Sequence, residues 1–144
     1  MKDILMKTET KENQEWKQFI SDGDKYLKTA LNGTRRKEVF TNDLLYNIVS
    51  MAIEKHFMGL LLFHNKMPDN HTLIDLIRSI KEITEIESDL EKNIEYMDDF
   101  QNICAIDTYE IKIPNEKEVE IFLATGKKVQ EFVKDKVGNL MCET

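Results

Sequence analysis

The chain has 144 residues, of which 20 are basic and 27 acidic, so its formal net charge is −7. This length suits a single domain, and the acidic balance disfavours a protein that holds nucleic acid through bulk charge. Only five Gly and two Pro are present, too few for the many turns of an all-β sandwich or barrel, and we therefore expect long helices.

The cysteines and the apolar runs bear on compartment and anchoring. Cys104 and Cys142 have no CxxC spacing, which predicts two reduced thiols instead of a disulfide framework or a zinc site. The longest uninterrupted apolar run, 57–63, is far shorter than the roughly 20 residues that a membrane span needs. Residues 1–13 lack the apolar core of a signal peptide. We expect a cytoplasmic protein with a flexible lead-in over 1–13.

The first helix is predicted over about residues 12–31, where apolar residues recur at helical spacing. Gly23 falls on this apolar stripe, and we expect it to let a neighbouring helix approach closely. Asn32 and Gly33 follow the stripe, and both residue types tolerate the left-handed conformation that ends many helices. The helix is therefore expected to stop there.

The second helix is predicted from Thr41 or Asn42 to about Phe63, and its apolar surface is unusually wide. The main stripe consists of Leu45, Ile48, Val49, Ala52, Ile53, His56, Leu60 and Phe63. A second stripe on the adjoining side consists of Leu44, Met51, Met58 and Leu62. Such a width is typical of a central bundle helix or of one that also meets another subunit. We interpret the second stripe as a candidate self-association surface.

Two further apolar segments follow the loop that contains Pro68. A third helix is predicted to begin at His71 or Thr72, and a helical period resumes after Ser88. A short break near 84–88 separates them in one interpretation, while a single long helix satisfies the same periodicity. The period is lost over 107–115, which indicates an extended loop.

The last helix has the clearest start signal in the sequence. Asn115 and Glu118 form a pattern close to the capping box, directly after Pro114. We expect this helix to end near 137–138. The elements together predict an all-α, up-and-down bundle of four to five antiparallel helices.

The predicted bundle forms one domain over 14–138, followed by a flexible tail over 139–144. The sequence contains no Gly-rich phosphate loop, no HExxH, no EF-hand loop and no GxSxG. None of the three histidines has a glutamate three residues before it, as the di-iron bundles require. We therefore expect neither a metal nor another cofactor.

Each histidine has a structural interpretation. His56 lies in the middle of the main stripe, which predicts a buried histidine that is hydrogen-bonded to a neighbour. His64 follows an apolar run at a helix end and is interpreted as part of a helix cap. His71, Asp75 and Arg78 follow roughly one helix face. This face is either a solvated charge face, which we favour, or the edge of a polar groove.

Four segments share a pattern with a known family: Ala-Ile-Glu-Lys at 52–55, His-Phe-Met-Gly-Leu-Leu at 56–61, the Pro68 loop, and His-Thr-Leu at 71–73. Together they resemble the HEPN family of bacterial and archaeal helical domains, in which an A-x-E-K-x-x-x-x-L-L helix precedes a loop and a His-x-Leu helix start. Lys-Ile-Pro-Asn at 112–115 stands where that family often has Arg-Tyr-Pro-Asp. The resemblance spans roughly 22–134 and implies a bundle of four or five helices that commonly dimerises.

The resemblance also implies two functional branches. Some HEPN members are ribonucleases, including toxins, in which four to six residues separate an Arg from a following His near the dimer seam. Others are inactive partners of small nucleotidyltransferases or have no assigned activity. Arg35, Arg36 and Arg78 are the only arginines here, and none has a histidine at that spacing downstream. Lys112 keeps the positive charge of the family's Arg-Tyr-Pro-Asp but lacks the planar fork of arginine, and Met58 replaces a position that is often basic.

The sequence therefore predicts a non-catalytic HEPN-like module that forms a homodimer and binds a protein or nucleotide partner. One example of such a partner is a small nucleotidyltransferase in a toxin–antitoxin-like pair. One alternative is an RNA-cleaving HEPN toxin with a non-standard site, in which His71, Arg78 and Lys112 form a candidate polar or ligand-binding surface. A third hypothesis is an unrelated helical adaptor. None of the three involves a membrane.

Overall fold

The computed structural model describes residues 2–106 and 113–142, with side chains described over 15–100 and 113–138. Its helices are α1 (Lys2–Gly33), α2 (Asn42–Phe63), α3 (Leu73–Lys81), α4 (Ser88–Ile106) and α5 (Glu116–Cys142). No strand occurs within these described ranges, which confirms the predicted all-α helical bundle. Nor does any helix in the same ranges combine the length and apolarity needed to cross a membrane.

The local start signals are confirmed at α2 and α5. In α5, the Glu118 backbone N–H donates to Asn115 Oδ1 at 2.8 Å, and the Asn115 N–H donates to Glu118 Oε1 at 3.0 Å. This is the reciprocal capping pattern that the sequence predicts. α2 begins at Asn42 as expected, although the Thr41 hydroxyl donates to Asp43 at 2.6 Å instead of accepting from the helix backbone.

Several boundaries differ from the prediction. α1 begins at Lys2 and passes through the segment expected as a lead-in, and α5 continues to Cys142. α1 ends at Gly33, as the sequence predicts, but Gly33 has no positive φ, so the expected left-handed cap is wrong. A Cβ at Gly33 would lie 2.6 Å from the Phe40 ring, and the glycine is needed for this close approach. The break between α3 and α4 spans 82–87, close to the predicted position.

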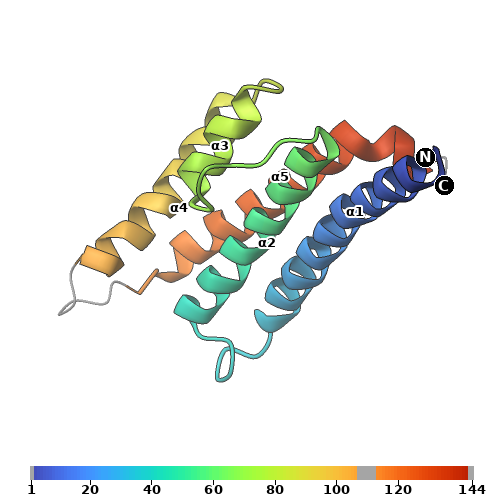
Figure 1. Ribbon diagram of the computed structural model, residues 1–144. Helices are drawn as coiled ribbons and strands as arrows, with labels where there is room; N and C mark the ends of the chain where they lie inside the picture. The colour runs from blue at the N-terminus through green and yellow to red at the C-terminus, as the bar shows by residue number, and fades with distance from the viewer. Residues whose placement is uncertain (1, 107–112, 143–144) are drawn as a thin grey trace.

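The helix directions depart from a simple up-and-down order at one connection. Figure 1 shows α1 antiparallel to α2, and α4 antiparallel to both α3 and α5. In contrast, α3 runs in the same direction as α2, because the connection 64–72 leads back across the bundle. Contacts at both ends agree with this: His71 meets Glu54 within α2, while Lys66 after α2 meets Glu82 after α3. The expectation that all neighbours are antiparallel is therefore wrong here. α3 is only about 14 Å long at 1.5 Å per residue, a distance that the extended connection covers easily.

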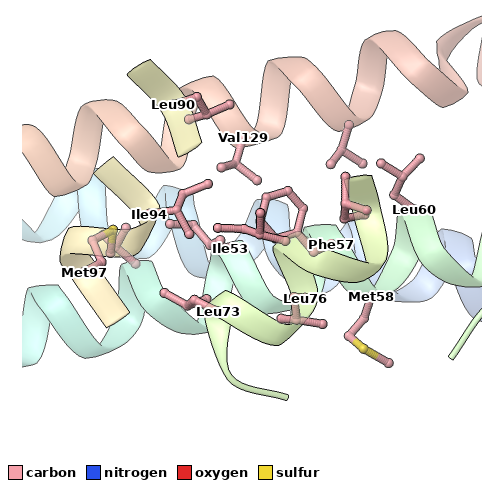
Figure 2. Close-up of a cluster of buried hydrophobic side chains, with 14 of the residues drawn as sticks. Ile53, Phe57, Met58, Leu60, Leu73, Leu76, Leu90, Ile94, Met97 and Val129 are labelled. Atoms are coloured by element: carbon pink, nitrogen blue, oxygen red, sulfur yellow. The ribbon is translucent and has the colours of Figure 1, made fainter. Parts of the chain in front are cut away.

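The core lies around α2, which packs against α1, α3 and α5. Figure 2 shows Phe57 and Ile53 of α2 surrounded by side chains from α3, α4 and α5. Gly59 brings α1 close, because a Cβ there would lie 3.0 Å from the Trp16 carbonyl oxygen. Each fully buried Leu, Ile or Phe contributes about 1.5–3 kcal/mol to stability. The buried residues of α2 are Leu45, Tyr46, Val49, Ala52, Ile53, His56, Phe57, Met58, Gly59, Leu60 and Leu61.

Candidate functional site

The second apolar stripe of α2 is divided by the fold into two parts. Leu44 and Met51, two turns apart on α2, remain 37% and 40% exposed. Met58 is 3% exposed, and Leu62 is half-buried. The stripe is therefore an exposed apolar surface at the beginning of α2 and the wall of a groove near its end.

This groove, which we call the α1–α2 groove, has a volume of about 440 Å³ and opens between α1, α2 and the connection 64–72. Its apolar lining consists of Phe19, Met58, Leu62 and Met67, and its polar lining consists of Glu15, Gln18, Asp22 and Lys55. Figure 2 shows Met58 pointing to the opposite side of α2 from Phe57 and Val129. Two methionines give the groove an adaptable surface, because the unbranched thioether chain changes shape at low cost.

The residues proposed for a polar surface are held by separate carboxylates. His71 Nδ1 lies 3.1 Å from Glu54 Oε1 of α2, and Arg78 lies 3.4 Å from Asp75 Oδ1 within α3. Asp75 is also part of the α3 cap, since its backbone N–H donates to the Thr72 hydroxyl at 3.2 Å. The Arg78 side chain is 75% exposed. These contacts match the solvated charge face that the sequence favours. Lys112 lies outside the described residues.

The structure reveals a polar cluster that is centred on the buried His56 and reaches solvent at Asp24 and Lys134, and no sequence signal predicts its members together. His56 is fully buried and its Nε2 lies 3.0 Å from Asp24 Oδ1, so the predicted buried and hydrogen-bonded histidine is confirmed. Gln130 Nε2 donates to the same oxygen at 2.7 Å, and Lys134 Nζ lies 2.9 Å from Asp24 Oδ2. We call Asp24, His56, Gln130 and Lys134 the His56 cluster. It joins α1, α2 and α5.

Gly23 makes room for this cluster. A Cβ at Gly23 would lie 2.9 Å from three atoms of the His56 ring, so the imidazole packs directly against the glycine backbone. The predicted close approach at Gly23 is confirmed, and the group that approaches is a polar ring. The sequence signal for the cluster was the presence of a glycine on one apolar stripe and a histidine on another. The carboxylate partner of His56 carried no such signal.

The protonation states in the cluster follow from burial and charge. Burial lowers the pKa of His56, and this effect outweighs the Asp24 carboxylate, which acts to raise it. Burial acts to raise the pKa of Asp24, but hydrogen bonds from Gln130, His56 and Lys134 hold it below its usual value. The cluster at neutral pH therefore contains a neutral imidazole and an ionised carboxylate. Because a carboxylate only accepts, the imidazole donates through Nε2.

The described side chains contain no group of three or more His, Cys, Asp or Glu that could hold a metal ion. The side chains of Cys104 and Cys142 lie outside the described set. Comparison of the chain with known protein families, with curated proteins and with solved structures finds no match. The HEPN resemblance therefore depends on the sequence segments quoted above.

Proposed function

We propose that this chain is a non-catalytic helical module that forms a homodimer through the exposed face of α2 and binds a partner. One observation carries the proposal: the central helix, which packs against three others, still exposes Leu44 and Met51 in line with the α1–α2 groove. In a two-fold dimer this surface meets its own copy, so each exposed residue is used twice. An apolar surface on a core helix is a typical interaction site.

The charges around this face are compatible with such a contact. Residues 15–66, which include α2, contain eight basic and six acidic side chains. Two copies approaching through this half of the chain therefore meet little net repulsion, although the whole chain carries −7. The acidic excess lies in the connection 82–87 and in α4.

The positions of the histidines support a non-catalytic role. His56 is fully buried and its Nε2 is occupied by Asp24, so a substrate has no access to it. His71 is exposed but engaged with Glu54, while Arg78 is engaged with Asp75. General acid–base catalysis requires such groups to converge within hydrogen-bond reach of one reacting atom.

The HEPN resemblance and the α1–α2 groove both support the proposal of a partner. As the resemblance implies, we propose a cytoplasmic protein or nucleotide partner, such as a small nucleotidyltransferase in a toxin–antitoxin-like pair. The groove at Met58 and Leu62 supports this proposal, because its apolar lining and its volume of about 440 Å³ fit a few side chains of a protein partner.

Sedimentation velocity at micromolar concentration tests the self-association. We expect the unaltered chain to sediment as a dimer and the double variant Leu44→Glu, Met51→Glu to sediment as a monomer. Ile121→Glu is the matched control, since Ile121 is similarly exposed but lies on α5. Circular dichroism confirms that each variant is folded. A strictly monomeric unaltered chain, or a double variant that still dimerises, contradicts the proposal.

A further inference from the structure

A second groove, which we call the α4–α5 groove, lies between the beginning of α4 and the second half of α5. It has a volume of about 460 Å³. Its lining consists of Leu90 and Phe132, the three carboxylates of Glu87, Glu131 and Asp135, and Lys128. Figure 2 shows Leu90 of α4 beside the ribbon of α5. Leu90 is buried and Phe132 is partly buried, so the groove has an apolar floor and a charged rim.

The rim of the groove carries carboxylates that are not paired with any described cation. Within the described part of the chain, Glu87, Glu131 and Asp135 form no ion pair, whereas the nearby Glu91 accepts from Lys81 at 2.7 Å. Lys128 also lines the groove, so three carboxylates face one lysine among its lining residues, with Lys136 beside Phe132. The surrounding segment adds to the field, because residues 69–100 contain ten acidic and only three basic side chains. Cationic groups are therefore attracted to this side of the bundle.

The aromatic part of the floor lies near a cation of the chain itself. The Lys136 ammonium lies 5.6 Å from the centroid of the Phe132 ring, within the range of a cation–π contact. The ring thus contacts a positive charge in the folded chain itself. Apolar and cationic groups of a ligand can both be accommodated where Phe132 and the three carboxylates meet.

We propose that the α4–α5 groove is a docking site for a cationic segment of another protein, in which an apolar side chain flanked by Lys or Arg packs on Leu90 and Phe132. The volume suits a few side chains of an extended segment. The loop 35–37 of a second copy is a poorer occupant, because Lys37 is already bonded to Asn42 and to Glu116. Two chains of net charge −7 also repel one another at this acidic face.

Fluorescence anisotropy with a short labelled peptide, acetyl-Lys-Lys-Leu-Arg-Lys-amide, tests the proposal on the full chain. We expect saturable binding that weakens as the salt concentration rises. The double variant Glu131→Lys, Asp135→Lys should weaken binding about tenfold, if each rim charge contributes about 0.7 kcal/mol. The matched control, Asp69→Lys with Glu120→Lys, makes the same change in net charge at exposed residues outside the groove. It should change the affinity by less than about threefold if the effect is local.

Replacing the leucine of the peptide by serine should weaken binding about fivefold or more, since the apolar side chain then no longer covers the floor. Absence of saturable binding overturns the proposal, as does equal weakening by the two double variants, which would indicate bulk charge alone. Equal binding of the serine peptide also overturns it. If the Glu131→Lys, Asp135→Lys variant instead abolishes dimerisation, the occupant is a second copy. The Leu44→Glu, Met51→Glu variant should bind the peptide normally, which separates this proposal from the proposed function.

Discussion

The carboxylate of Asp24 on α1 accepts a hydrogen bond from the fully buried His56 on α2, with 3.0 Å between Oδ1 and Nε2. The same carboxylate is bound by Gln130 and Lys134 of α5, so one acidic side chain joins three helices. A carboxylate that is hydrogen-bonded from three directions favours one arrangement of the helices that carry its partners. The relative placement of α1, α2 and α5 is therefore linked to the ionisation of two groups.

The first prediction concerns the pH dependence of stability. The pKa of His56 in the folded chain is lowered by burial below its ordinary value of 6.5. Between that lowered pKa and 6.5 the unfolded chain binds more protons than the folded chain, so the free energy of unfolding falls as the pH falls below 6.5. The slope from one proton is at most about 1.4 kcal/mol per pH unit. Asp24 contributes in a lower window, since its own stabilising contribution is lost only below its usual pKa of 3.8.

Urea unfolding at several pH values between 7.5 and 4.5 measures this dependence. We expect His56→Gln to flatten the decrease below pH 6.5, even if it lowers the stability at pH 7.5. The exposed His64 provides a matched control, and His64→Gln should keep the decrease of the unaltered chain. A slope in this window that is the same for all three proteins would show that His56 does not titrate there.

The second prediction separates the charge of Asp24 from its hydrogen bonds. Asp24→Ala leaves His56 without its partner and should lower the free energy of unfolding by about 1–3 kcal/mol. Asp24→Asn keeps an acceptor for the imidazole and should cost less. Asp22→Ala, two residues earlier on α1 and half-exposed, should change stability by less than about 0.5 kcal/mol. Urea midpoints at pH 7.5 provide the comparison, and an Asp22→Ala effect as large as that of Asp24→Ala would contradict it.

The third prediction compares two helical glycines, one with closely packed surroundings and one with open surroundings. Gly23→Ala places a Cβ 2.9 Å from the buried His56 ring and should destabilise the chain by roughly 1–3 kcal/mol. At Gly138 a Cβ meets no described atom within 4 Å, and Gly138→Ala should stabilise the helix by about 0.5–1 kcal/mol. Thermal unfolding should therefore show shifts of opposite sign. Unchanged or raised stability of Gly23→Ala would contradict the assignment of Gly23 as a contact glycine, and a loss of stability in Gly138→Ala would contradict the open surroundings of Gly138.

The features that the sequence predicts correctly depend on short-range residue spacing or on helical periodicity. The Asn115 and Glu118 cap depends on a spacing of three residues, and the burial of His56 follows from its place on an apolar stripe. The partner of His56 is different, because Asp24 is 32 residues away and nothing in its neighbourhood marks it. A pairing of this kind is set by the packing of α1 on α2, which periodicity does not fix.

The candidate surfaces also combine features that periodicity predicts with features that depend on tertiary packing. Periodicity places Leu44 and Met51 on one face, and both are exposed as a self-association surface requires. Periodicity places Met58 on that face too, yet Met58 is buried beside α1 and the connection 64–72. The path of that connection, which makes α3 parallel to α2, is a tertiary property. For the same reason the α4–α5 groove, built from residues of two helices, was not predicted.

The fourth prediction concerns RNA cleavage by the alternative set of His71, Arg78 and Lys112. Cleavage by general acid–base chemistry requires at least two of these groups within reach of one phosphodiester. His71 is instead engaged with Glu54 from α2, and Arg78 with Asp75 from its own helix. We therefore expect the purified chain to leave a labelled RNA intact over hours on a denaturing gel. Cleavage by the unaltered chain that His71→Ala abolishes, while His64→Ala does not, would identify His71 as a catalytic residue and reject the non-catalytic proposal. Cleavage that both variants retain would exclude these two histidines and point to a nuclease site elsewhere on the chain, which would equally reject that proposal.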